Sequence, residues 1–259
     1  GDINLIFFSY LGSTITSLIY SLIVLKNFFV FDISGLYSNI KKIFWFGLKL
    51  SSINWFAIIG QHLDVFALSF FVPIEILAIY SIALSFASFF DMIFSSFGQI
   101  ILSEVSHLSS RNDYTQINKL LFQTFRLMIS LGLIIWMFSL LIFEYALEII
   151  ISREIAFDQV AMVYYILSLG FILRLTFDSL DISIAAIGKP LKLFPVVFVP
   201  LIFRLCMYPL FLPLYGLISL VAIKFFAIMI LAGMSYYLIK KNIGFSIDIN
   251  IVITYLAVV

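Results

Sequence analysis

Residues 217–239 read LISLVAIKFFAIMILAGMSYYLI, and Lys240 and Lys241 follow them directly. Lys224 is the single charged residue in this run. A helix of about 20 apolar residues crosses a hydrocarbon core about 30 Å thick. The run therefore predicts a membrane-spanning helix, and the lysine pair indicates that this helix ends at a membrane surface.

The rest of the chain has a similar composition. Of its 259 residues, 63% are hydrophobic and 11% are charged, and the mean hydropathy is +1.17. A soluble domain has about 45–50% apolar and about 25% charged residues, so lipid must be the solvent for most side chains here. The net charge of +1 comes with no basic patch and excludes nucleic-acid binding. Cys206 is the single cysteine, which excludes an internal disulfide.

Seven segments are long and apolar enough to span a membrane. They are residues 4–25, 43–71, 76–102, 120–143, 160–187, 191–212 and 217–239, and residues 249–259 could begin an eighth. Alternating strands of about ten residues, typical of a membrane β-barrel, are not visible. We expect an all-α polytopic membrane protein with about seven transmembrane helices.

Lys and Arg concentrate in every second connection between these segments. The basic connections are 26–42, 103–119, 188–192 and 240–241, whereas 72–75, 144–159 and 213–216 are acidic or uncharged. Basic loops stay on the cytoplasmic side of a membrane. We therefore expect a multi-pass protein of the plasma (inner) membrane, with Gly1 outside the cell.

Prolines gather in one predicted helix. Pro195, Pro200 and Pro209 lie inside the segment 191–212. Each proline removes a backbone donor and can kink a helix. A static bend and a hinge that moves during transport both remain open.

Charged residues at membrane depth are costly, at about 2.5 kcal/mol or more each, and normally face a partner or a cavity. Arg174, Asp178 and Asp181 share one helix face at positions i, i+4 and i+7. An Arg–Asp pair explains one aspartate, and the second is left for a proton or a neighbouring cation. Arg204 and Lys224 have no acid within one helical turn. They must reach the membrane surface, meet an acid across the bundle, or line water.

The segment 43–71 carries an unusual polar group of Gln61, His62 and Asp64. A structural polar cluster and a proton-coupling site are both open for these residues, since histidine titrates near neutrality. Asp91 lies near mid-membrane without a nearby base, which suggests a function. Lys49 can reach the membrane surface by extending its side chain.

Sequence motifs for catalysis are missing. The chain has no glycine-rich phosphate loop, no His-rich metal spacing and no Gly-x-Ser-x-Gly elbow. We expect a protein that is not an enzyme and holds no cofactor and no metal. Gly1 begins no basic n-region and Val259 ends an apolar run, so we expect no signal peptide and a fragment of a longer protein.

Several short motifs occur in the order and spacing of one transporter family. They are Lys42–Leu48, Asp64, Ile74–Ala83, Ser109–Leu120, Ile187–Pro190 and Leu214–Leu217. With these motifs the chain resembles the polysaccharide-export flippases of the multidrug/oligosaccharidyl-lipid/polysaccharide superfamily over about residues 40–241. Ala78 stands where the family usually has a glycine.

The resemblance implies a fold of two six-helix bundles arranged as an inverted V. Residues 1–26 are then the last helix of an otherwise missing N-terminal bundle, and residues 27–42 are the cytoplasmic linker. Residues 43–241 form the C-terminal six-helix bundle, and 242–259 start a possible further helix. The N-terminal half of the protein is the expected partner of this chain.

The function that the resemblance implies is alternating access, which moves an undecaprenyl-diphosphate-linked oligosaccharide outward for surface polysaccharide biosynthesis. Diphosphate needs cationic side chains in a wet cavity. Depth and charge lead us to assign headgroup contact to Arg174, Arg204 and Lys224. We assign ion coupling with Na⁺ or H⁺, or charge pairing, to Asp64, Asp91, Asp178 and Asp181.

Three other functions stay open. One is a purely structural membrane subunit, which would not need unpaired charges at depth. A multidrug-type cation antiporter of the same superfamily would use intramembrane aspartates and avoid cations in its cavity. A membrane-embedded polysaccharide polymerase or ligase has a similar composition but needs a large external loop with arginines. The longest external connection here, 144–159, is acidic.

Overall fold

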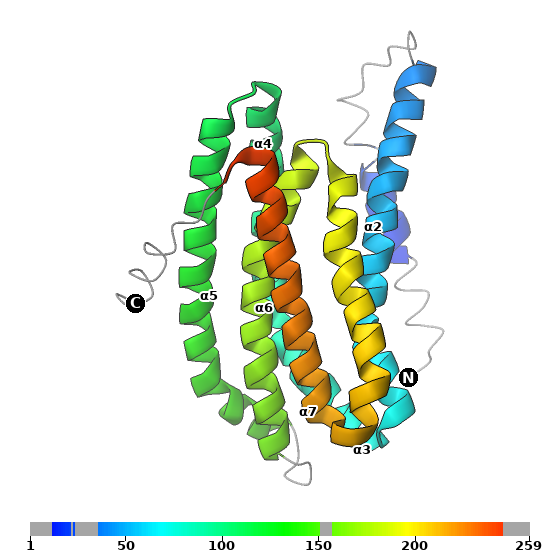
Figure 1. Cartoon of the computed structure of the whole chain (residues 1–259), viewed down its shortest axis with the longest axis vertical. Helices are drawn as coiled ribbons and strands as arrows, with labels where there is room; N and C mark the ends of the chain where they lie inside the picture. Colours follow the sequence, from blue (N-terminus) through cyan, green and yellow to red (C-terminus); the bar gives the residue numbers. More distant parts are fainter. Residues whose placement is uncertain (1–11, 22, 24–35, 151–156, 246–259) are drawn as a thin grey trace. The chain divides into compact units, whose positions relative to one another are not determined.

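The computed structural model describes residues 12–21, 23, 36–150 and 157–245 (Figure 1). The chain forms two compact units, residues 1–47 and residues 48–259. The described residues are almost all helical and include no strand. The predicted spans 4–25 and 249–259, the linker 27–42 and the connection 144–159 lie wholly or partly outside the described residues.

Six long helices and one short 3₁₀ helix make up the described part beyond residue 35. They are α2 (Leu36–Phe71), α3 (Ile74–Ala87), α4 (Phe89–Ser110), α5 (Tyr114–Ile150), α6 (Phe157–Ala186), η1 (Pro190–Leu193) and α7 (Phe194–Ile243). Helix α2 begins inside the predicted linker, seven residues before the predicted span 43–71.

The chain is a membrane protein by the length and hydropathy of its helices. Among the described residues, four helical stretches can cross a membrane: Ile74–Ser110, Tyr114–Ile149, Asp158–Ala186 and Pro190–Ile243. The expected count of about seven is therefore met only in part. Helix α2 is not among the four, and it carries the polar residues Gln61, His62 and Asp64 in an otherwise apolar stretch.

The last of these stretches is folded back on itself. Gly216 has φ 54° and ψ −133°, which interrupts the helix and separates α7 into two arms. The Lys192 ammonium just before the first arm bonds the Asn242 side chain near the end of the second, so the arms are antiparallel (Figure 1). The arms correspond to the predicted segments 191–212 and 217–239. The helix runs on through Pro200, Pro209 and Pro213, so the turn is made by the glycine and not at Pro213.

The predicted connection 103–119 is helical for most of its length. Helix α4 continues to Ser110, and only residues 111–113 form a turn before α5. Asn112 adopts φ 55°, a conformation that asparagine tolerates better than most residues. The Asp113 carboxylate accepts a hydrogen bond of 3.0 Å from the Gln116 backbone N–H and caps α5. Counting apolar residues misses such polar helical turns because they extend beyond the hydrocarbon.

Helix α6 is the centre of the second unit, and it packs against α3, α4, α5 and α7. Its aromatic residues join the core, for example Tyr164, which stacks on Phe143 of α5 at 3.8 Å between ring centroids. Helix α6 thus has neighbours on several sides. This arrangement explains how it can carry three charged residues within a span.

The three basic turns of the second unit lie at one end of the bundle. The Asn118 side chain near the start of α5 donates a hydrogen bond of 3.3 Å to the Ile243 carbonyl at the end of α7. The bond between Lys192 and Asn242 brings the turn after α6 to the same place. This agrees with the charge pattern, which assigns these three turns to one side of the membrane.

We predict that Gly216→Val destabilises the protein, because a β-branched residue is strained at φ 54°. The expected loss in unfolding free energy is about 1–3 kcal/mol, measured by denaturant unfolding in mixed micelles. Gly233→Ala is the matched control, since Gly233 is helical and has open space beside it. Equal stability of Gly216→Val and the wild type would contradict a turn that depends on this glycine.

Candidate functional site

A carboxylate with no exposed surface lies at the meeting point of three helices. Asp64 of α2 is 2.7 Å from the Lys224 ammonium and 3.1 Å from the Arg204 guanidinium, both on α7. It also accepts hydrogen bonds from the hydroxyls of Tyr80, at 3.0 Å, and of Tyr208. We call these five residues the Asp64 cluster.

Helix ends and the fold of α7 bring the cluster together. Asp64 lies two turns before the end of α2, and Tyr80 lies within two turns of the start of α3. Arg204 and Tyr208 are one turn apart on the first arm of α7, and Lys224 lies on the second arm. The cluster therefore needs the hairpin at Gly216, because without it the two cations are far apart.

A glycine in α2 makes room for the arginine. The Arg204 guanidinium donates a hydrogen bond of 2.8 Å to the Gly60 carbonyl, one turn before Asp64. A Cβ atom at position 60 would lie 2.8 Å from Nη2 of Arg204, which is closer than real Cβ contacts. Gly60 thus allows one guanidinium to bind both a backbone carbonyl and the carboxylate.

The Asp64 cluster carries an excess of positive charge, because one carboxylate faces two cations. The Lys224 ammonium lies over the rings of Tyr80 and Phe171, at 5.5 and 5.6 Å from the centroids, which is favourable for a cation. Nε of Arg204 is buried and donates no hydrogen bond within the described part of the chain. The cluster therefore holds one buried donor without a described partner.

A second group of charges lies on α6 and has the opposite sign. Arg174 is 3.6 Å from Asp178, and Asp181 accepts a hydrogen bond of 3.0 Å from Ser235 of α7. Asp91 of α4 is half-buried and, like Asp178 and Asp181, interacts electrostatically with Arg174; it also interacts with Lys224 of the Asp64 cluster. We call these five residues the acidic group.

The acidic group contains three carboxylates and one guanidinium. One oxygen of Asp181 is buried and accepts no hydrogen bond from any described residue. The group can therefore take up positive charge, as a proton or as a cation. Among the described residues, no set of three or more His, Cys, Asp and Glu side chains is arranged to hold a metal ion.

The structure separates residues that the sequence grouped. Asp64 is buried, whereas Gln61 and His62 in the same turn are exposed and do not join its cluster. Arg174 pairs with Asp178 and not with Asp64, which binds the two other cations assigned to the headgroup. Lys49 is exposed at the start of the second unit.

Sequence reasoning gave no site role to Tyr80, which it placed only in the motif Ile74–Ala83. It missed Gly60 and Tyr208, which contact Arg204 or Asp64, and Ser235, which bonds Asp181. Tyr208 carries a usable signal, because it follows Arg204 by four residues and so shares its helix face. Gly60 and Ser235 give no such signal, since small residues are common in membrane helices for packing.

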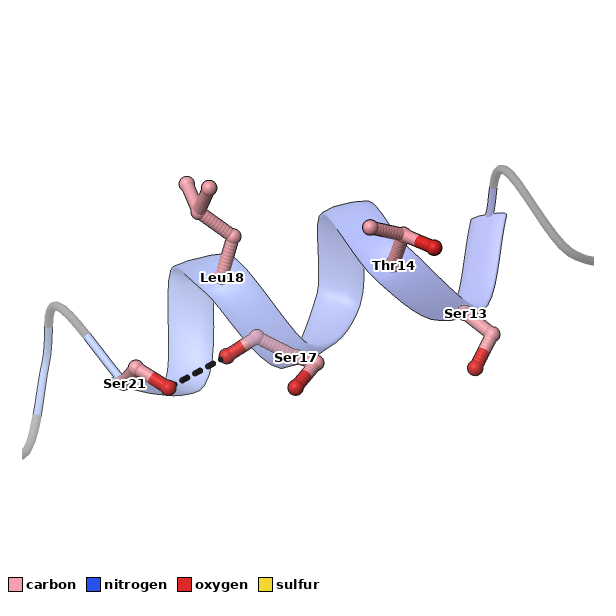
Figure 2. A pocket seen from close by; sticks show the side chains of 5 residues that line it. All are labelled: Ser13, Thr14, Ser17, Leu18 and Ser21. Carbon is pink, nitrogen blue, oxygen red and sulfur yellow. Dashed lines mark hydrogen bonds between the residues drawn. The ribbon is translucent and has the colours of Figure 1, made fainter. Parts of the chain in front are cut away.

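A stripe of hydroxyls in the first unit offers no comparable chemistry. Figure 2 shows Ser13, Ser17 and Ser21 along residues 12–21, with Thr14 and Leu18 beside them. The Ser21 hydroxyl donates to the Ser17 carbonyl at 2.8 Å, within the same helix. This surface is exposed and holds no charged side chain within the described residues.

No protein-family model, no curated protein and no solved structure matches this chain.

We predict that Asp64→Asn lowers the unfolding free energy by about 3–5 kcal/mol, because it leaves two buried cations without their counterion. In a Lys224→Met background the loss caused by Asp64→Asn should be smaller by about 0.5–3 kcal/mol, because the two residues interact directly. Denaturant unfolding of the four proteins in mixed micelles measures this difference. If the losses in unfolding free energy from the two substitutions simply added, this would contradict the ion pair. Glu75→Gln, which removes an exposed acid, is the control.

We also predict that Gly60→Ala destabilises the protein by about 1.5–3 kcal/mol, the range for a lost hydrogen bond to a charged group. The added methyl group displaces the Arg204 guanidinium from the Gly60 carbonyl. Gly47→Ala is the control in the same helix, because nothing lies within 4 Å of its Cβ position. If both variants had the same unfolding free energy, the close contact between Arg204 and Gly60 would not contribute to stability.

Proposed function

We propose that this chain belongs to a transporter that moves an undecaprenyl-diphosphate-linked oligosaccharide across the plasma membrane by alternating access. The observation that carries this proposal is the excess positive charge of the Asp64 cluster, with Arg204 and Lys224 held inside a membrane protein. The resemblance of residues 40–241 to the polysaccharide flippases supports it. In this proposal the chain supplies the C-terminal bundle and acts without chemical conversion or cofactor.

The chemistry of the substrate suits this cluster. A diphosphate is a multivalent anion that arginine and lysine bind by charge-assisted hydrogen bonds. The polyprenyl chain can remain in lipid while the sugars and the diphosphate cross in a polar space. Nε of Arg204 has no described partner, and the Lys224 ammonium, which bonds Asp64 and the Tyr80 hydroxyl, keeps one of its three N–H groups for such a headgroup.

The acidic group favours a second candidate, a cation-coupled antiporter of the same superfamily. Asp91, Asp178 and Asp181 exceed the charge of Arg174, which is what a Na⁺ or H⁺ site inside a membrane requires. The two candidates differ in the role of the Asp64 cluster. An antiporter needs these cations for structure only, whereas a flippase needs them for its substrate.

We predict that Arg204→Gln and Lys224→Gln each slow export of lipid-linked oligosaccharide at least about tenfold, since a hydrogen bond to a charged group contributes about 1.5–3 kcal/mol. The measurement is surface polysaccharide in a strain that lacks its own flippase and expresses the full-length protein. The exposed Lys49→Gln serves as the control for loss of a positive charge.

Protein levels in the membrane must be equal for this comparison. Wild-type surface polysaccharide from both variants, at normal levels, would remove the headgroup role of the cluster. If cation exchange in proteoliposomes then depended on Asp178, the antiporter would be the better supported of the two functions.

A further inference from the structure

The oxygens of Asp64 are fully occupied by donors that also bind phosphate. One oxygen faces Arg204 and Tyr208, and the other faces Lys224 and Tyr80. Guanidinium, ammonium and phenol groups are common donors to phosphate oxygens as well as to carboxylates. The carboxylate therefore sits where an anionic ligand of the two cations would sit.

Charge balance favours replacement of this carboxylate by phosphate. Arg204 and Lys224 together carry two positive charges, and Asp64 is the one described carboxylate in direct contact with them, whereas Asp91 acts on Lys224 without an ion pair. A doubly charged phosphate group neutralises both, which is a better match in a medium of low dielectric constant. Substrate and Asp64 cannot both use the same donors fully.

Asp64 is also an attachment of α2 to the rest of the second unit. Its bonds reach α3 and both arms of α7, and the Gly60 carbonyl adds a bond to Arg204. Phe56, two turns before Asp64 in α2, makes edge-to-face ring contacts with Phe194 and Phe198 of α7. Most of the polar attachment of α2 described here therefore passes through the two cations.

We propose that Asp64 is a resident substitute for the phosphate of the substrate, so that phosphate binding to Arg204 and Lys224 releases Asp64 and loosens α2 from α3 and α7. This inference rests on the proposed function. It adds a conformational switch in which substrate binding releases Asp64. A carboxylate without partners is costly inside a membrane. Its release therefore favours a conformation in which α2 moves and Asp64 reaches water.

The test measures a distance between α2 and α7 by spin labels. Cys206 is exposed on the first arm of α7 and is the chain's single cysteine, and Ile58→Cys adds a second site on the exposed side of α2. The doubly labelled protein is placed in phosphatidylcholine nanodiscs. The probes are farnesyl diphosphate, farnesol as the uncharged match, and inorganic diphosphate.

We expect farnesyl diphosphate to lengthen the distance by about 2–5 Å, the range of helix shifts in switching proteins, and farnesol to leave it unchanged. An equal effect of inorganic diphosphate assigns the switch to the phosphate groups alone. An effect of farnesyl diphosphate only assigns it to the lipid headgroup at the membrane. Both results support the proposal.

A variant tests the role of the carboxylate itself. Asp64→Asn should lengthen the distance without any ligand and bind farnesyl diphosphate at least about tenfold more tightly, because the internal competitor is weakened. Glu75→Gln removes an exposed acid near the same end of α3 and should leave both the distance and the affinity unchanged. The measurements on the protein with native Asp64 decide the question even if Asp64→Asn does not fold.

Two results separate the switch from the proposed function. Saturation of the protein with farnesyl diphosphate at an unchanged distance would overturn the switch and leave the transporter in place. If neither diphosphate bound to the protein with native Asp64, the proposed function itself would fail, and the switch with it.

Discussion

The pairing of Asp64 with Arg204 and Lys224 is the constraint on which the described bundle depends. Each of these charges is expensive in a membrane if it stands alone, and an unpaired buried ion costs several kcal/mol. The three charges can meet only if α7 folds back at Gly216, if α2 lies beside both of its arms, and if Gly60 leaves room for the guanidinium. Two tyrosine hydroxyls complete the shell of the carboxylate. The cluster therefore links the backbone turn, the packing of three helices and the electrostatics of the site.

The two charged groups of the second unit differ in their balance of charge, although Asp91 also interacts electrostatically with Lys224. Positive charge exceeds negative charge in the Asp64 cluster, which lies toward the Gly216 end, and the reverse holds in the acidic group on α6. Asp181 and Ser235 lie toward the end with the basic turns. A transporter that carries an anion and exchanges a cation has a use for two such regions. This difference is the physical basis for considering both a flippase and an ion-coupled antiporter.

Much of the fold could be predicted from particular residues. The apolar run 217–239, the turn at Gly188 and the basic pairs near the helix ends all lie where composition indicates. The end of α4 could not be found in this way, because its last turns are polar and extend beyond the hydrocarbon. The acid at Asp113 followed by Gln116 is the capping signal that marks the start of α5. The first predicted span and the tail after residue 245 lie beyond the described residues.

By itself, the sequence determined that lipid is the solvent, that helices cross it, and that a few charges must find partners, because hydrophobicity and charge are properties of the residues alone. The i, i+4 spacing of Arg174 and Asp178 already predicted their pair. Only the tertiary structure decided which partner Arg204 and Lys224 find, because both meet Asp64 across 140 residues or more. The reason is physical: a span's depth follows from local composition, whereas the direction of a side chain follows from how the helices pack and where Gly216 turns the chain.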